Sequence, residues 1–302
     1  MKVTAPSLPA AAVAEKSRWA LYADLFKARL STLVLLTTLV GFYLGAAGPV
    51  DYWRLVHTML GTALVVAAAA ALNELWERRF DARMKRTQDR PLPSGRLQPE
   101  AVFRLGVSFA LAGLVYLAVA VNLTTALLGA LSLFCYLFLY TPLKRVTSWN
   151  TAVGTIPGGL PPLMGWTAAR DGFTPEGLSL LVILALWQIP HFMAIAWIYR
   201  DDYARAGFKM LPVVEPDGKR TARHALLSTL LLLLAAVWPF FLGLTGKTYL
   251  AGGLLLSLAY VWQARRFALD LNLSSARRLF LVSILYLPLL LGLMVLDKAR
   301  FY

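Results

Sequence analysis

Residues 55–81 read LVHTMLGTALVVAAAAALNELWERRFD. The part up to Leu72 has no charged side chain, and as an α-helix it is long enough to cross most of the ~30 Å hydrocarbon layer of a bilayer. The remainder carries three acids and two arginines within nine residues. The segment therefore predicts a membrane-spanning helix whose last turns hold a concentration of polar side chains.

The whole chain has the composition of a membrane protein. Of its 302 residues, 58% are hydrophobic and 15% are charged, whereas soluble domains have about 25% charged residues. Apolar stretches of spanning length occur nine times, at residues 30–48, 55–76, 103–121, 123–140, 150–168, 177–199, 224–243, 248–264 and 279–296. We expect an all-α, polytopic membrane protein with nine transmembrane helices.

The domain organisation follows from these stretches. Residues 30–302 predict a single membrane-embedded domain, because no long polar insert separates the spans. Residues 1–29 form a cytoplasmic lead, whose last part, 17–29, mixes aromatic and charged side chains as an amphipathic helix does.

The basic residues predict the orientation. The formal net charge is +14, and 25 of the 30 Lys and Arg residues fall on the side of the N-terminus. By the positive-inside rule, the chain is integral to the cell (inner) membrane with its N-terminus cytoplasmic and its C-terminus on the opposite side. No folded basic domain outside the membrane is expected, which argues against nucleic acid as a partner. The single cysteine, Cys135, excludes disulfide frameworks and thiolate metal sites.

A stripe of oxygen-bearing side chains marks the inner end of the second span. Asn73, Glu77 and Asp81 follow one another in steps of four, so each is ~6 Å further along a helix and turned by only ~40°. An amide and two carboxylates can hold Mg²⁺ and leave positions open for phosphate oxygens. The arginines at 83–96 have the guanidinium forks that fit phosphate. Spacing alone leaves an alternative open, in which the acids pair with neighbouring bases in a solvated loop.

Two further segments predict parts of the site: a second acidic cluster and a segment rich in Gly and Pro. Asp201 and Asp202 end the sixth span on the same membrane face as Asn73–Asp81, so the two clusters together could clamp a metal diphosphate between two helices. Residues 154–166 are too rich in Gly and Pro for a straight helix. They predict an interrupted helix at a cavity wall, with a packing kink as the alternative.

An ionisable side chain is expected inside the membrane. His191 precedes Asp201 by ten residues, which places it about 15 Å deeper along a regular helix. Such side chains usually face a bundle interior or a cavity, and Gln188 would share that face. His191 could ligate a porphyrin iron, accept a proton or orient a polar substrate edge; a neutral imidazole bonded to a neighbouring helix is the structural alternative.

Five blocks of sequence stand in order along the middle of the chain. They read NxxxExxxDxxMxRTxxRPLPSG at 73–95, YTPLKR at 140–145, PPxxGW at 161–166, WQxPHF at 187–192 and DYxxAGxxMLPV at 202–213. Together these blocks resemble the protohaem IX farnesyltransferases, also called haem O synthases, of the intramembrane UbiA-type prenyltransferase superfamily. Glu77 departs from the Asp of many members, and the second acidic motif has adjacent acids instead of widely spaced ones.

The resemblance implies a bundle around a central cavity and an Mg²⁺-dependent reaction. A farnesyl group would pass from farnesyl diphosphate to a vinyl group of haem B, with addition of water, to give haem O. The implied metal ligands are Asn73, Glu77, Asp81 and Asp202, and the implied diphosphate-binding residues are Arg86, Arg90, Lys144 and Arg145. Gln188 and His191 fall on the haem side, and Asn73, Glu77, Asp81 and His191 form the implied catalytic set.

Two other functions are open at this stage. A sibling enzyme would prenylate a quinone precursor, and a polytopic transporter could also have nine spans and intramembrane polar groups. The blocks at 187–192 and 210–213 favour haem as the acceptor, and acids beside arginines on one face only favour a head-group site over a path through the membrane. Membrane lipid and proteins that supply haem or act as haem A synthase are the remaining expected partners.

Overall fold

The computed structural model describes residues 17–299, in which all regular elements are helices apart from a single β-bridge between Thr245 and Lys298. The fold class predicted from the sequence is confirmed. In chain order the helices are α1 (Arg18–Leu25), α2 (Ala28–Gly45), α3 (Tyr52–Asp81), α4 (Pro99–Ala120), α5 (Leu123–Phe134), η1 (Cys135–Tyr140), α6 (Thr141–Val146), α7 (Asn150–Arg170), α8 (Pro175–Ile198), α9 (Arg200–Ala206), α10 (Leu211–Val214), α11 (Lys219–Phe241), α12 (Lys247–Asp270) and α13 (Leu273–Leu296).

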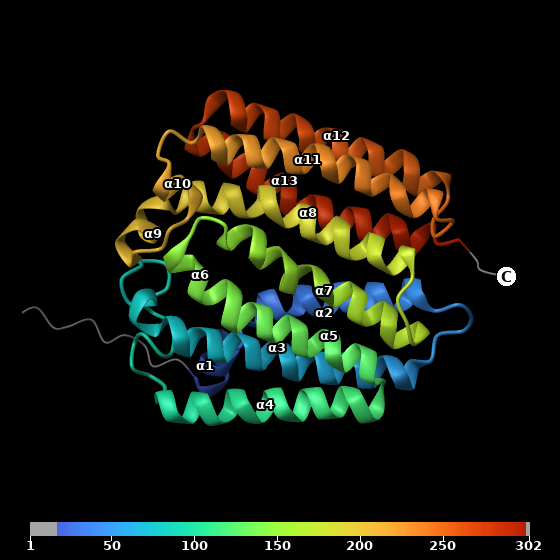
Figure 1. Cartoon of the computed structure of the whole chain (residues 1–302), viewed down its shortest axis with the longest axis horizontal. Coiled ribbons are helices and arrows are strands. Elements are labelled where there is room, and N and C mark those ends of the chain that lie inside the picture. The colour runs from blue at the N-terminus through green and yellow to red at the C-terminus, as the bar shows by residue number, and fades with distance from the viewer. Residues whose placement is uncertain (1–16, 300–302) are drawn as a thin grey trace, which may run out of the picture.

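Each apolar stretch of the sequence corresponds to a long helical segment. Seven of these segments are long and apolar enough to cross a membrane: α2, α3, α4, the run from α5 to α6, α8, α11 and α13. The other two are α7, which is rich in Gly and Pro, and α12, which has Gly, Ser and Gln among its apolar residues. Helix α7 lies inside the bundle and α12 lies at its edge beside α11, and a count of nine spans stays a prediction (Figure 1).

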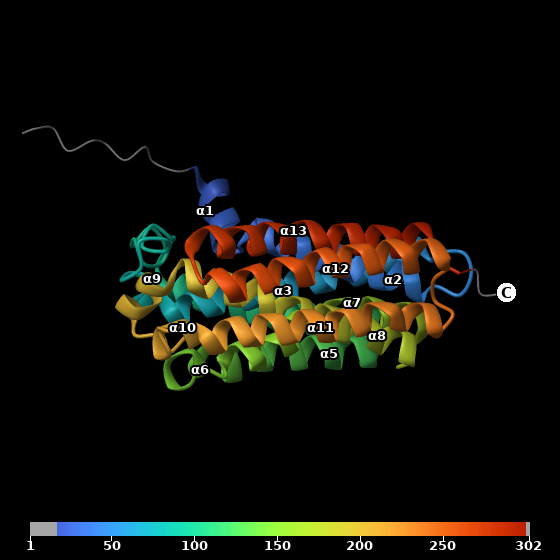
Figure 2. The same ribbon diagram turned by 90° about the horizontal axis from the view of Figure 1, so that it is seen from above.

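The long helices run side by side along one direction (Figures 1 and 2). At one end lie the loop after α3 together with α6, α9 and α10, whereas the turns after α2, α7 and α11 lie at the other end (Figure 1). Helix α1 and the described C-terminal end are at opposite ends of the bundle. The sequence blocks at 73–95, 140–145 and 202–213 therefore meet at one end, which we call the α3 end.

The leading segment is only partly described. Residues 1–16 lie outside the described residues, and α1 follows as a short helix with Leu25 buried and Trp19 exposed. The helix stops before Lys27, which has a left-handed backbone with φ 49°. Its location at a membrane surface stays a prediction.

The Gly- and Pro-rich segment forms a continuous helix, so the expected interruption is wrong. Helix α7 holds Pro157, Pro161 and Pro162 without a break, and most of its length is buried. Close packing against α2 supports it: a Cβ at Gly165 would come within 2.0 Å of the Thr38 carbonyl oxygen. The glycines are needed for helix packing, which was the alternative interpretation.

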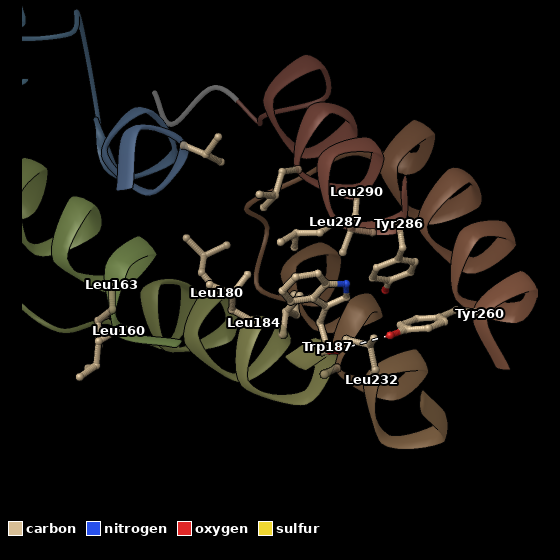
Figure 3. Packing of buried hydrophobic residues seen from close by; sticks show 14 of the residues in the cluster. Leu160, Leu163, Leu180, Leu184, Trp187, Leu232, Tyr260, Tyr286, Leu287 and Leu290 are labelled. Carbon is tan, nitrogen blue, oxygen red and sulfur yellow. Dashed lines mark hydrogen bonds between the residues drawn. The ribbon is translucent and has the colours of Figure 1, made fainter. Parts of the chain in front are cut away.

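The interior beside α8 is built around Trp187 (Figure 3). The Trp187 indole donates to the Ser283 carbonyl at 2.8 Å, and the Tyr260 hydroxyl donates to the Trp187 carbonyl at 3.4 Å. Tyr260 also packs against Tyr286, with ring centroids 5.1 Å apart. Helices α8, α12 and α13 are thereby tied together one turn before His191.

Replacing Gly165 with Ala tests the α2–α7 packing. The new methyl group has to push the α2 backbone away, which costs on the order of 1–3 kcal/mol, as overpacking does in other cores. The thermal midpoint of the detergent-solubilised protein should fall. Gly292→Ala in α13 is the control, because a Cβ there meets nothing within 4 Å; equal midpoints for the two variants would contradict the packing role.

Candidate active site at the α3 end of the bundle

The acidic stripe lies inside the protein. Asn73, Glu77 and Asp81 have 1%, 5% and 1% of their surface exposed, and all three belong to the last turns of α3. A buried carboxylate is costly unless a cation or several hydrogen bonds compensate for its lost hydration. Their burial therefore requires partners from other segments.

Basic residues from two different segments balance the carboxylates. Lys144 of α6 donates to both oxygens of Glu77, at 2.8 and 3.1 Å. Arg90, in the loop after α3, donates to Asp81 at 2.7 Å. Burial disfavours the charge on Arg90, but the Asp81 carboxylate more than compensates and raises the pKa of Arg90. Two of the four predicted diphosphate-binding residues thus lie directly on the acidic stripe.

Asn73 binds a lysine that the sequence analysis did not select. The Lys27 ammonium donates to Asn73 Oδ1 at 2.7 Å, and the Asn73 amide donates to the Thr141 hydroxyl at 3.1 Å. Burial, with Arg90 as the next cause, lowers the pKa of Lys27 to about 8. The signal available in the sequence was weak: Lys27 is one of several charges before the first span. Only the turn between α1 and α2 brings it to α3.

The fourth span contains an irregularity beside this contact. Residues 135–140 form the π-helical segment η1, and the Thr141 hydroxyl donates to the Tyr136 carbonyl at 2.8 Å. Single π turns inside α-helices are frequent at functional sites. The Lys144 ammonium lies 4.5 Å from the centre of the Tyr140 ring, so the irregular turn also supports the partner of Glu77.

The other two predicted basic residues lie on aromatic rings. Arg145 stacks over Phe80 at 4.4 Å, and Arg86 donates to the Tyr203 hydroxyl at 3.1 Å. A pocket of about 270 Å³ reaches Glu77 from the side of α3 and α6. It is lined by Trp76, Glu77, Phe80, Thr141, Pro142, Arg145, Val146 and Phe208.

The second acidic motif, which begins at Asp201, contacts the region after α3 through aromatic side chains and not through its acids. Helix α9 lies at the α3 end (Figure 1), and Tyr203 and Phe208 pack with Met84 in one buried cluster. The Asp202 carboxylate itself pairs with Arg205, and Asp201 is exposed. Within residues 17–299, no three His, Cys, Asp or Glu side chains are grouped closely enough to hold a metal. A role of Asp202 as a metal ligand therefore stays a prediction.

The donor set of the stripe fits a hard divalent cation. Asn73, Glu77 and Asp81 offer amide and carboxylate oxygens, which Mg²⁺ prefers. These residues are withdrawn from solvent, and each of them already accepts a hydrogen bond from a cationic side chain. The site is thus built to stabilise positive charge at these oxygens.

A buried glutamate holds the loop after α3 in place. Glu74 is fully buried and its Oε1 accepts the Leu92 backbone N–H at 3.0 Å. Leu92 stands between Pro91 and Pro93, which have no N–H of their own, so this is the single backbone donor of the three residues. Because Arg90 is two residues away, the contact positions Arg90 against Asp81. The sequence analysis missed Glu74, which lies off the i, i+4 stripe.

His191 lies deeper along α8 and contacts α13. Its Nδ1 is 2.7 Å from the Ser283 hydroxyl, and that hydroxyl donates to the Phe280 carbonyl at 2.5 Å. A serine hydroxyl has one proton, so when Ser283 donates it to Phe280, His191 is the donor at Nδ1 and keeps the lone pair on Nε2. The imidazole lies between the Trp187 and Phe280 rings, with centroids 5.0 and 5.1 Å away.

Gln188 and His191 point to different neighbours. The Gln188 side chain donates to the Leu184 carbonyl of its own helix at 3.0 Å and lies against Gly158 of α7. The two side chains therefore contact different helices, Gln188 reaching α7 and His191 reaching α13, although positions three apart on α8 are turned by only about 60°. Their assignment to a haem-binding region stays a prediction.

The fold and the site define an integral membrane protein with a buried, charge-paired site at one end of a helical bundle. The sequence profile of the UbiA prenyltransferase family matches residues 34–286, and the chain belongs to that family. It is therefore a membrane transferase, and the transporter alternative has no support.

The resemblance seen in the five sequence blocks is confirmed by full-length relatives. The protohaem IX farnesyltransferase of Solibacter usitatus is 46% identical over 92% of this chain and 98% of its own length. That of Koribacter versatilis is 42% identical over 92% of this chain and 93% of its own length. The mitochondrial protein of the same name from Arabidopsis thaliana is 38% identical over 92% of this chain and 64% of its own length.

Solved structures share the fold at low sequence identity. A digeranylgeranylglyceryl phosphate synthase superposes with a TM-score of 0.77 at 15% identity, covering 92% of this chain and 98% of its own. A UbiA homologue from Archaeoglobus fulgidus bound to GPP and Mg²⁺ superposes with a TM-score of 0.64 at 15% identity, covering 91% and 99%.

Replacing Glu74 with Leu should release the loop that carries Arg90. Loss of a hydrogen bond to a charged acceptor corresponds to roughly 1.5–3 kcal/mol, so the Leu92 amide should exchange its hydrogen about 10–100 times faster. The exchange of the Leu92 amide can be measured separately, because Pro91 and Pro93 have no amide hydrogen. Glu74→Gln keeps an oxygen that can accept the Leu92 hydrogen bond, so its exchange should change less. Glu100→Gln, which replaces an exposed acid in α4, is the matched control. Unchanged exchange in Glu74→Leu would refute the positioning role.

Proposed function

We propose that the protein transfers the farnesyl group of farnesyl diphosphate to a vinyl group of haem B and adds water, which yields haem O. The observation that carries the proposal is the set of buried acids with basic partners at the α3 end, in a chain that is 46% identical to a protohaem IX farnesyltransferase over nearly its whole length. A quinone precursor as acceptor is the second candidate.

The charges of the site support binding of a metal diphosphate. We assign Mg²⁺ to Asn73, Glu77 and Asp81, with Asp202 as a fourth ligand, where it would offset the charge on the diphosphate and favour its departure. When the carboxylates are balanced in this way, Lys27, Arg90 and Lys144 no longer have to balance them. Three cationic side chains then match a diphosphate ester, which carries about three negative charges at neutral pH.

The basic side chains act on the leaving group. Arg90 and Lys144, with Arg86 and Arg145 beside them, can donate to the diphosphate oxygens as the bond from farnesyl C1 to oxygen breaks and the diphosphate leaves with the bonding electrons. The terminal vinyl carbon of haem then forms a bond to C1. Water adds to the resulting cation and loses a proton, which leaves a hydroxyl group on the carbon next to the ring. The apolar bundle interior keeps water away from the farnesyl cation until that step.

His191 is the residue that favours haem over a quinone precursor. Its Nε2 lone pair is directed by the contact of Nδ1 with Ser283, and an imidazole nitrogen of this kind can ligate haem iron or take up a proton. A phenolic quinone precursor offers no metal to such a nitrogen. We therefore place haem on the α13 side of α8.

The orientation is proposed on the same basis. The described N-terminal end lies at the α3 end and the described C-terminal end lies at the other (Figure 1). Since most Lys and Arg residues belong to the α3 end, we infer that this end is cytoplasmic and that the protein resides in the inner cell membrane with its C-terminus on the opposite side. The site would then receive farnesyl diphosphate from the cytoplasmic side.

Product analysis tests the reaction. Purified protein incubated with haem B, farnesyl diphosphate and Mg²⁺ should produce a porphyrin whose mass has increased by a farnesyl group plus a hydroxyl group. Chelation of the metal should stop the reaction, and Glu77→Gln should lower the rate on the order of 100-fold because it removes a charged ligand. The control is Glu100→Gln in α4. Unchanged haem together with a prenylated quinone precursor would establish the second candidate instead.

Replacing His191 with Ala tests the acceptor assignment. Loss of the Nε2 lone pair should weaken haem binding about 10–100-fold and change the haem absorption spectrum, while the affinity for farnesyl diphosphate stays the same. The matched control is His57→Ala, whose imidazole contacts Tyr116 at 2.7 Å near the other end of α3. Full haem affinity and activity in His191→Ala would remove the proposed role.

A further inference from the structure

A second pocket lies outside the proposed active site. It has a volume of about 400 Å³ and is walled by Arg78 and Arg79 of α3 and by the loop that leads into α4. Arg78 and Arg79 follow Glu77 directly, so on a helix they are turned by about 100° and 200° away from it. The lining of the pocket contains none of the stripe residues Asn73, Glu77 and Asp81.

The two arginines are available to a ligand. Arg78 is half-buried and Arg79 is exposed, and within residues 17–299 neither guanidinium has a hydrogen-bond or ion-pair partner. The residues that line the pocket include no acid. Uncompensated guanidinium groups on a pocket wall fit phosphate oxygens, which they can bind in a bidentate manner.

The remaining walls and the location of the pocket indicate an amphiphile. Leu92, Pro93 and Leu97 form the apolar wall opposite the arginines. The pocket also lies where α4 begins, and α4 is at the edge of the bundle (Figure 1), with Phe103 and Leu111 exposed by 55% and 62%. A ligand in the pocket would thus have its phosphate beside the arginines and its apolar part beside a helix face that is available to lipid.

We propose that this pocket is a binding site for the phosphodiester headgroup of an anionic membrane lipid. The site is separate from the acidic stripe, because Glu77 and Asp81 do not line this pocket. It is also adjacent to the loop after α3: Leu92 lines the pocket with its side chain while its N–H is held by Glu74. A bound headgroup would therefore stabilise the same loop that presents Arg90.

Lipid retention by the intact protein tests the site. The full-length protein in detergent is mixed with equal amounts of dioleoylphosphatidylglycerol and dioleoylphosphatidylcholine, and retained lipid is measured by native mass spectrometry. We expect one retained phosphatidylglycerol and at least a tenfold higher dissociation constant in the double variant Arg78→Gln/Arg79→Gln, since each charge contributes roughly fivefold.

The matched control is Arg277→Gln/Arg278→Gln, an adjacent and exposed arginine pair at the start of α13, at the same end of the bundle. An equal loss of lipid in this control would show diffuse attraction to a basic surface and overturn the site. Equal retention of phosphatidylcholine would also overturn it. Inorganic phosphate that displaces the lipid at equal concentration would show that the ligand is soluble phosphate, which overturns the lipid assignment.

Farnesyl transfer in lipid-free detergent separates this inference from the proposed function. We expect the Arg78→Gln/Arg79→Gln variant to retain the rate of the unmodified protein, which also shows that it is folded. The protein could show no farnesyl transfer and still bind phosphatidylglycerol selectively through these arginines. That outcome would contradict the proposed function and leave the lipid site supported.

Discussion

The architecture of the site depends on the need to compensate buried negative charge. Glu77 and Asp81 are almost completely withdrawn from water, where an uncompensated carboxylate destabilises a fold by about 3–5 kcal/mol. Lys144 and Arg90 satisfy that need, and they come from α6 and from the loop after α3. The compensation therefore ties the fourth span and the loop to α3, and the same contacts assemble a basic surface around the acids.

The structure shows a modified form of one alternative considered for the acidic stripe, in which the acids pair with bases. The acids do pair with bases, but the pairing is buried and involves residues that are distant in sequence, such as Glu77 and Lys144, instead of solvated neighbours. An ion pair of this kind can reorganise when a cation and an anion arrive together, because each charged side chain then has a new partner of opposite charge. This property makes a charge-paired resting state compatible with the proposed binding of a metal diphosphate.

The loop after α3 connects the two ligand sites proposed for this end of the bundle. Its inner side is fixed by Glu74 and presents Arg90 to Asp81, whereas the side chain of Leu92 lines the outer pocket beside Arg78 and Arg79. The residues proposed to bind the reactants and those proposed to bind lipid are therefore connected through this loop.

The sequence alone determined the fold class, the position of the long helices within a few residues, and the acidic stripe, because hydropathy and the 3.6-residue period are local properties. The family resemblance of its motifs also pointed to Arg90 and Lys144, which the structure places on that stripe. It did not identify Lys27 or Glu74, whose significance arises only when a turn or loop brings them to α3. It predicted a broken α7, since the support that neighbouring helices give to a Pro-rich helix is a tertiary effect. The different neighbours of Gln188 and His191 were likewise decided by which helices pack against α8, which only the tertiary structure specifies.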